Sequence, residues 1–293
     1  MNKSPKSHAD STIIRPPWWK RPRLAWAALF VIIAIGLATY GWSQQTTTPA
    51  IRPEPSQATK DKPWTNSLGM AFVPVPKTKV LFCIWETRVK DYQAFANAKQ
   101  KEWLKPDFQQ GPDHPAVLVS WEEAQEFCKW LTEKERGEGR LTAEQRYRLP
   151  TDVEWSYAVG IGEREGNSTP KDKDGKIENV YPWGNQWPPP NKAGNYADFS
   201  SSKIAGFTDG YERTAPVGSF KSNELGIFDL GGNVWEWCED FYDGQSSGRV
   251  LRGASWFNDN RDYLLSAFRN SESPFSGYDS IGFRVVLVVG SAP

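Results

Sequence analysis

The sequence predicts an α+β domain with little regular secondary structure, preceded by one transmembrane helix. Three observations support this: helical patterns end near residue 160, 24 Gly and 22 Pro favour long loops, and 15 Trp, 15 Phe and 10 Tyr are far too many for a disordered chain. The 293 residues include 35 basic and 35 acidic side chains. This balance argues against a nucleic-acid-binding protein that relies on bulk positive charge.

The net charge of zero conceals two unlike parts. Residues 1–63 hold nine Lys or Arg and three Asp or Glu, a net charge of +6. The remaining residues hold 26 basic and 32 acidic side chains, a net charge of −6. We therefore expect a basic N-terminal arm and a mildly acidic folded body.

Residues 24–42 form an uncharged run of nineteen residues, long enough as a helix to cross the roughly 30 Å hydrocarbon core of a bilayer. Trp and Tyr lie at both ends, where aromatic rings favour the membrane interfaces. Residues 1–23 carry six basic side chains and one acidic one, so they predict a cytoplasmic tail and an extracytoplasmic C-terminal domain. The alternative is a cleaved signal peptide, but the run exceeds a typical apolar region and no small-residue cleavage site follows directly. We expect an uncleaved, single-pass signal anchor.

Residues 43–63 are rich in Pro, Thr, Gln and Ser and offer little to bury, so they predict an extended tether. The folded domain is then expected over residues 64–293.

Cysteine and histidine usage restricts the chemistry of this domain. Cys83, Cys128 and Cys238 cannot all pair with one another and lie in no CxxC spacing, so we expect no disulfide framework. The only histidines are His8 and His114, which excludes a His-rich iron, copper or zinc centre.

Regular elements are expected mainly before residue 160. Short apolar runs predict strands at residues 69–74 and 80–85. Beyond residue 160, short strand-like runs interrupt the loops, the clearest of them at 249–252 and 283–289. Periodicity and capping residues predict three helices: 88–98 with Thr87 as N-cap, a second from the capping box Ser120/Glu123 to about residue 136, and a short third from Thr151/Glu154 through Tyr157. The long loops that follow need ligands or aromatic packing to fix them. Phe228, Val234, Trp235 and Trp237 are expected in the core.

Seven segments stand in order along the body: HPAVLVSWEEAQEFCKWL (114–131), YRLPTDVEWSYA (147–158), YPWGN (181–185), APVGSF (215–220), NELGIFDLGGNVWEWCEDFY (223–242), RVLRGASW (249–256) and IGFRVV (281–286). Together they resemble the formylglycine-generating enzyme (sulfatase-modifying factor) family. The opening NSLGMAFVPVP (66–76) is similar to the N-terminal edge of the same family. The resemblance implies an elaborated C-type-lectin-like fold, with a small twisted antiparallel sheet, two helices, and loops held by aromatic residues and calcium.

The resemblance also implies two calcium sites. The first would use the side chains of Asn195 and Asp209 and the carbonyls of Tyr196 and Tyr211; the second would use the side chains of Asp229 and Glu236 and the carbonyls of Gly232 and Val234. Carboxylates and carbonyls are the ligands that calcium prefers, and a bound ion would order the loops. The alternative is that these acids are ordinary hydrogen-bonding groups.

The oxidase activity of the family uses two copper-binding cysteines between its RGGSW-like and GFR-like motifs. Aligning Arg269 with the arginine after the second cysteine places the two positions at Arg261 and Ser266. A guanidinium and a hydroxyl cannot replace thiolates as copper ligands. Family members that use iron rely on His clusters, which this chain lacks. We therefore expect neither copper nor iron, and no oxidase activity.

Residues 257–280 have an unusual composition in place of those cysteines. Sixteen of the 24 residues are Asn, Ser, Asp, Tyr or Phe, whose codons include AAC or AAT or differ from these only at the two adenines. The segment resembles the variable region of proteins diversified by retroelements, which often use this lectin-like fold. The candidate ligand-binding residues are Phe257, Asn258, Asp259, Tyr263, Phe268, Ser271, Ser273, Phe275, Ser276, Tyr278 and Ser280. Tyr and Phe supply contact area at low entropic cost, and Ser, Asn and Asp supply adaptable hydrogen bonds.

The expected function is that of a membrane-anchored, non-catalytic display protein that binds a protein or glycan on another surface, and no nucleic acid. Two alternatives stay open: an oxidoreductase like the enzymes of the family, and a constitutive envelope module in which residues 257–280 are an ordinary polar loop. The aromatic residues of this segment favour a binding face, because aromatic side chains are unexpected in a loop that only contacts solvent.

Overall fold

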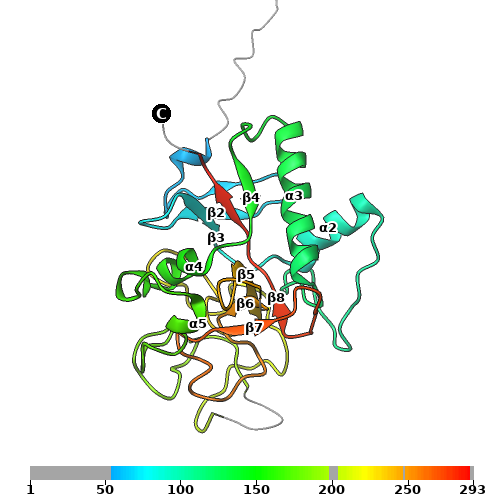
Figure 1. The fold of residues 1–293 in the computed structure, drawn as a ribbon. Coiled ribbons are helices and arrows are strands. Elements are labelled where there is room, and N and C mark those ends of the chain that lie inside the picture. Colours follow the sequence, from blue (N-terminus) through cyan, green and yellow to red (C-terminus); the bar gives the residue numbers. More distant parts are fainter. Residues whose placement is uncertain (1–53, 198–203, 247, 291–293) are drawn as a thin grey trace, which may run out of the picture. The chain divides into compact units, whose positions relative to one another are not determined.

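The computed structural model describes residues 54–197, 204–246 and 248–290 (Figure 1). The contacts between residues divide the chain into units at 1–51 and 52–293, and the described residues all belong to the second. The predicted cytoplasmic tail and transmembrane span at 1–23 and 24–42 lie outside the described residues. Within the described ranges, no helix is long and apolar enough to cross a membrane.

Two small sheets form the centre of the domain. The first is antiparallel with the strand order β1-β2-β3-β9-β4, and the second has the order β7-β6-β5-β8, in which β5 and β8 are parallel (Figure 1). Their bounds are Trp64–Thr65 (β1), Ala71–Pro74 (β2), Val80–Cys83 (β3), Arg146–Arg148 (β4), Trp235–Phe241 (β5), Arg249–Arg252 (β6), Asn270–Glu272 (β7), Ile281–Gly282 (β8) and Val286–Val288 (β9). This mixed architecture is consistent with a C-type-lectin-like fold.

The helices lie around these sheets, α3 beside β4 and α2 against α3 (Figure 1). Their bounds are Val89–Lys99 (α2), Trp121–Gly137 (α3), Asp152–Val159 (α4) and Pro170–Lys173 (α5), with 3₁₀ turns at Pro55–Gln57 and Gly162–Arg164. Both predicted capping boxes are confirmed. The Ser120 hydroxyl accepts the Glu123 amide at 3.2 Å, and Thr151 accepts Glu154 at 3.2 Å.

The predicted N-cap of the first helix is wrong. Thr87 is held in an extended pairing, because its amide donates to the Phe283 carbonyl at 2.8 Å and its carbonyl accepts from Ala116 at 2.8 Å. The helix therefore begins one residue later, with Arg88 as the N-cap. The Asp91 carboxylate accepts both the Arg88 amide and the Arg88 guanidinium there.

The strand predicted over residues 283–289 is shorter than expected and begins only at Val286. Residues Ile281–Gly282 pair in the second sheet and Val286–Val288 in the first, so the chain passes between sheets at Arg284. The Arg284 guanidinium is fully buried and donates to Glu236, which holds the crossing in place. Strand β5 was not predicted, because its polar residues obscure the strand pattern. The three other predicted strands, over 69–74, 80–85 and 249–252, are confirmed with slightly different bounds.

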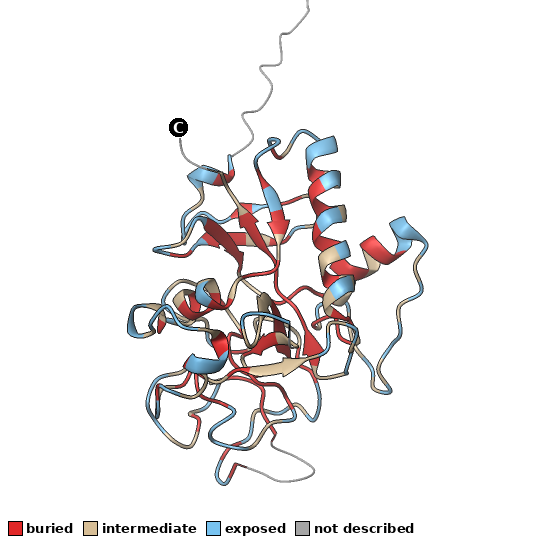
Figure 2. Ribbon diagram, viewed as in Figure 1, coloured by how far each residue is buried: buried red, intermediate tan, exposed pale blue. Residues whose placement is uncertain are grey.

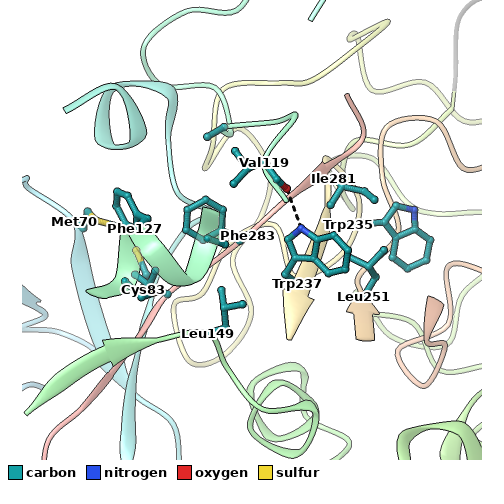
Figure 3. Packing of buried hydrophobic residues seen from close by; sticks show 14 of the residues in the cluster. Met70, Cys83, Val119, Phe127, Leu149, Trp235, Trp237, Leu251, Ile281 and Phe283 are labelled. Atoms are coloured by element: carbon teal, nitrogen blue, oxygen red, sulfur yellow. Dashed lines mark hydrogen bonds between the residues drawn. The ribbon is translucent and has the colours of Figure 1, made fainter. Parts of the chain in front are cut away.

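Many loop residues around the two sheets are buried along with the strands (Figure 2). Aromatic side chains form much of this core, as the composition predicts. Trp237 is fully buried, and its indole N–H donates to the Val119 carbonyl at 3.0 Å (Figure 3). Val234 and Trp235 are also buried, whereas Phe228 is only partly so. All three cysteines are free and buried, in agreement with the absence of a predicted disulfide framework.

The folded domain begins earlier than the sequence indicates. Residues 54–63 were expected to end the tether, yet Pro55 is buried and Ala58 packs against the main hydrophobic cluster. The Thr59 amide also donates to the Lys62 carbonyl at 3.1 Å. The small apolar surfaces of proline and alanine are sufficient to dock this short segment.

Candidate ligand-binding face and calcium sites

The exposed aromatic side chains of the domain are concentrated in residues 257–280. Only six large hydrophobic side chains are exposed among the described residues, and four of them belong to this segment: Phe257 at 63%, Tyr263 at 42%, Phe275 at 73% and Tyr278 at 49%. The other two are Leu104 and Val153. Gathered exposed apolar groups are typical of interaction sites, whereas scattered ones are not.

A series of contacts draws the two ends of the segment together. The Phe257 ring lies against Trp256, with centroids 5.7 Å apart, and the Trp256 indole N–H donates to the Asp279 carbonyl at 3.2 Å. The next carbonyl, that of Ser280, accepts the Trp235 amide at 2.9 Å.

The middle of the segment joins the same surface through its rings. Trp235 contacts Phe268 with centroids 6.0 Å apart, and Phe268 contacts Tyr263 at 4.9 Å. We call the exposed or partly exposed rings of this segment, those of Phe257, Tyr263, Phe268, Phe275 and Tyr278, the aromatic face. Phe275 lies on the following turn, where the Pro274 carbonyl accepts the Glu122 amide at the start of α3.

Several of the candidate ligand-binding residues form contacts within the domain or are partly buried. Asn258 accepts the Ser255 amide at 2.9 Å and the Ser255 hydroxyl at 2.8 Å, so its amide oxygen fixes a turn. Ser271 is a half-buried member of β7, and the Ser273 hydroxyl accepts the Phe275 amide. Phe268 is only partly exposed because it packs on the core. The remaining candidates, Asp259, Ser276 and Ser280, are half-buried.

A buried ionic network holds this segment to the scaffold, and the sequence did not reveal it. The Asp152 carboxylate binds the Arg269 guanidinium at 3.0 Å, the Lys173 ammonium at 2.6 Å and the Arg252 guanidinium. Arg269 also binds Glu165 through two nitrogens, each at 2.7 Å. Burial alone would raise the pKa of Asp152, but the ion pairs with Arg252, Arg269 and Lys173 outweigh it and hold that pKa well below its usual range.

The positions aligned with the copper ligands hold an arginine with other partners and a buried serine. The Arg261 guanidinium donates to the Tyr181 hydroxyl and to the Asn179 side chain, each at 2.6 Å. Ser266 is buried, and its carbonyl accepts from Arg252 at 2.7 Å. No cysteine occurs anywhere in residues 249–290. The three cysteines lie in the core, where burial raises the pKa of Cys83 to about 12, so its thiol stays protonated.

Hydrogen bonds to Asp209 connect the residues of the first candidate calcium site. Asp209 accepts the Tyr196 amide at 2.8 Å and the Tyr211 amide at 2.9 Å, which brings the two halves of the site together. Asn195 is fully buried and donates through its amide nitrogen to the Arg213 carbonyl at 2.8 Å. Its side-chain oxygen has no hydrogen-bond partner. A buried unpaired oxygen is costly, and a cation ligated there would satisfy it.

The second candidate site also contains an unpaired buried oxygen. One Asp229 oxygen accepts the Gly218 amide at 2.7 Å, and the other has no partner. Gly232 has φ +82° and lies so close to Asn195 that a Cβ would be 2.3 Å from its carbonyl oxygen, so only glycine joins the two sites this way. Glu236 is already bound by Arg284 at 2.6 Å and by the Trp155 indole at 3.1 Å.

Glu86 is a member of the second site that the sequence did not suggest. It is fully buried and accepts the Asn233 side chain at 2.7 Å and the Val234 amide at 3.2 Å. Burial and the neighbouring carboxylates Asp229 and Glu236 raise the pKa of Glu86, and burial raises that of Asp229 to about 6. Three buried acids therefore lie near one arginine, although no group of three or more His, Cys, Asp or Glu in the described ranges is arranged to hold a metal ion. The sequence signal that could have identified Glu86 is its position directly after the apolar run 80–85.

Known proteins with similar sequences include formylglycine-generating enzymes and an inactive counterpart. Bovine inactive C-alpha-formylglycine-generating enzyme 2 is 33% identical over 188 residues, 62% of this chain and 52% of that protein. The formylglycine-generating enzyme of Streptomyces coelicolor is 28% identical over 229 residues, 67% of this chain and 62% of that protein. The chain thus spans about half to three fifths of the length of these relatives.

Solved structures show the same fold. PvdO from Pseudomonas aeruginosa superposes with a TM-score of 0.52 at 24% identity, covering 71% of this chain and 80% of PvdO. Treponema denticola variable protein 1 superposes with a TM-score of 0.51 at 21% identity, covering 71% of this chain and 84% of that one. The family described as "Sulfatase-modifying factor enzyme 1-like domain" matches residues 21–289, and this chain belongs to that family.

Proposed function

We propose that this protein is a membrane-anchored, non-catalytic binding protein whose aromatic face recognises a protein or glycan on another surface. The observation that carries the proposal is the concentration of exposed aromatic side chains in residues 257–280. Aromatic rings of this kind dominate binding energy in recognition surfaces, because they bury much area with few rotatable bonds. The N-terminal span proposed at 24–42 would hold the domain outside the membrane by the positive-inside rule.

The non-catalytic part of the proposal rests on the chemistry of the same segment. Residues 249–290 hold no cysteine. The Arg261 guanidinium is bound to Tyr181 and Asn179, and the Ser266 side chain is a buried hydroxyl without a hydrogen-bond partner. A relative is itself described as inactive, which is compatible with this reading, although other relatives are formylglycine-generating enzymes. Incubation of the copper-treated protein with a cysteine-containing peptide should leave the peptide unchanged by mass spectrometry. Conversion of its cysteine to formylglycine would establish the enzymatic alternative.

We also propose that the exposed positions of the segment vary while its buried positions do not. Replacing Phe257, Tyr263, Phe275 and Tyr278 together by Ser should change the melting temperature by no more than about 2 °C, because exposed substitutions cost little. The matched single variant Leu264→Ser, at a buried position of the same segment, should unfold many degrees lower, since buried large-to-small changes cost roughly 2–5 kcal/mol. Differential scanning fluorimetry measures both. Equal loss in the two variants would mean that the aromatic face belongs to the core.

Diversification by a retroelement has a direct test in the flanking DNA. We expect a near-copy of the codons for residues 250–285, with AAC or AAT at the candidate positions, beside a reverse transcriptase gene. If close relatives in one genome do not differ preferentially at these positions, the domain is instead a constitutive module of the envelope.

We propose in addition that two calcium ions bind at Asn195/Asp209 and at Asp229/Glu236. The two unpaired buried oxygens, Asn195 Oδ1 and Asp229 Oδ1, support this. The ions would neutralise the buried acids and fix the loops around the aromatic face.

A further inference from the structure

A large cavity lies outside the segment that carries the aromatic face. Its volume is about 840 Å³, within the roughly 300–1,000 Å³ typical of small-molecule sites, and none of its lining residues belongs to 257–280. Its walls come from the end of α4 with the turn after it, from residues 180–184 and 190–193, and from residues 221–225. We call it the lysine cleft, after Lys77, Lys192 and Lys221 in its lining.

Two half-buried aromatic rings give the cleft a fixed apolar surface. Trp183 is at the tip of a tight turn closed by hydrogen bonds of 2.8 and 2.9 Å between Tyr181 and Gly184, and its ring stacks on Tyr181 with centroids 4.8 Å apart. Tyr157 lies beneath the turn that follows α4. A Cβ at Gly162 would be 2.5 Å from the Tyr157 ring, so only glycine allows this turn to lie there.

The lysines give the cleft a small excess of positive charge beside these rings, since its lining holds three lysines and two acids, Glu163 and Glu224. The Lys221 amide donates to the Lys192 carbonyl at 3.2 Å, which sets the backbones of the two residues side by side. Neither ammonium forms an ion pair within the described part of the chain. Lys77 and Glu163 are 3.6 Å apart, but both side chains are more than two thirds exposed and the pair is well screened.

The backbone of this site is unusual as well. Lys77 and Lys192 have φ values of +65° and +66°, a left-handed conformation that glycine or asparagine normally occupies. Lysine at both positions keeps an ammonium on the cleft despite the conformational cost. Such disfavoured conformations concentrate at functional sites, where other structure holds them in place.

We propose that the lysine cleft binds a short anionic saccharide. The Trp183 and Tyr157 rings would contact the apolar C–H face of a sugar ring, and Lys192 and Lys221 would pair with its carboxylate or sulfate groups. A small inorganic anion would leave the rings unused, and a neutral sugar would leave the ammonium groups unpaired. The volume of the cleft accommodates two or three sugar residues rather than one ion.

Isothermal titration calorimetry on the full-length protein in detergent tests the proposal. The ligands are trigalacturonate, which carries carboxylates, a heparin tetrasaccharide, which carries sulfates, neutral maltotriose and inorganic sulfate. We expect at least one anionic saccharide to bind at least tenfold more tightly than maltotriose or sulfate, and more weakly as salt rises. Whether the carboxylate or the sulfate ligand binds identifies the acid group. Equal binding of maltotriose or sulfate, or no binding of either anionic saccharide, would overturn the proposal.

The chain offers a matched control for charge. The double variant Lys192→Gln/Lys221→Gln should weaken binding of the anionic saccharide at least tenfold. Lys99→Gln/Lys129→Gln removes the same charge from a second hollow, at α2 and α3, and should leave binding unchanged. Equal weakening would mean that net charge rather than the lysine cleft is responsible. Because Lys192 and Lys221 are exposed, the double variant should retain its fold. The ring is tested separately: Trp183→Phe should still bind the anionic saccharide, whereas Trp183→Ala should not.

The proposal stands apart from the function of the aromatic face. Phe257→Ser should leave saccharide binding in the cleft unchanged, whereas it should weaken recognition at the aromatic face. Loss of saccharide binding in this variant would show that the cleft and the aromatic face act as one site, which would contradict the proposal of a separate cleft.

Discussion

Replacing Asp152 by Asn should lower the free energy of unfolding by about 3–5 kcal/mol, the usual loss when one partner of a buried ion pair is removed. The reason is the set of buried cations that Asp152 neutralises, namely Arg252, Arg269 and Lys173. In the variant Glu165 would still pair with Lys173 and Arg269, whereas Arg252 would lose the one ion-pair partner it has among the described residues. For a domain of this size the melting temperature should fall by about 10 °C, which calorimetry or fluorimetry measures.

The same carboxylate gives a defined pH dependence. Because the ion pairs hold the pKa of Asp152 below its unfolded value of about 3.9, the folded state binds fewer protons there than the unfolded state. The contribution of Asp152 is therefore fully present above about pH 4 and is lost as the pH falls further. The stability difference between wild type and Asp152→Asn should be constant from pH 5 to 7 and shrink below pH 4.

An exposed aspartate provides the control for this experiment. Asp61→Asn changes the same charge at an exposed position and should leave the urea midpoint within experimental error at every pH. A similar small effect of Asp152→Asn would show that Arg252 and Arg269 have adequate partners without it.

Removal of calcium should produce a second large effect. A ligand that binds only the folded state stabilises it by about 2.7 kcal/mol per site at one hundred times its dissociation constant. Two sites would together account for roughly 5 kcal/mol. We therefore expect a chelator to lower the melting temperature by at least 10 °C, and added calcium to restore it. Elemental analysis of the dialysed protein should find two calcium ions per chain.

Variants separate the two calcium sites. Asn195→Ala should remove the first site and Asp229→Asn should weaken the second, so each should reduce the calcium-dependent rise in melting temperature by about half. Magnesium should not substitute, because it demands octahedral geometry and keeps its waters. A melting temperature that chelator leaves unchanged would remove both sites from the description of this domain.

Local sequence rules predicted the elements whose causes are local. The capping boxes at Ser120 and Thr151 formed as expected, because each needs only a hydroxyl and a glutamate three residues apart. The aromatic positions of 257–280 were also anticipated from composition, and four of them are exposed. Thr87 failed as an N-cap because pairing with Phe283 and Ala116, distant in sequence, fixed its backbone first.

Features made by distant residues could not be found in this way. Asp152 and Arg269 are separated by 117 positions, and Glu86 and Asn233 by 147, so no spacing pattern connects them. The lysine cleft likewise combines Lys77 with Lys221. Burial determines how strongly such charges affect stability or binding, and the burial of a residue depends on the fold of the whole domain.

The position of β9 between β3 and β4 has a consequence for synthesis of the protein. A polypeptide that stops or shifts frame within residues 257–280 lacks β8 and β9, so β3 and β4 lose the strand that joins them. Contacts between such distant residues form only after the whole intervening chain exists. Faulty translation products should therefore remain unfolded and be degraded. Only chains in which residues 257–280 have been translated in full and in frame can complete the first sheet.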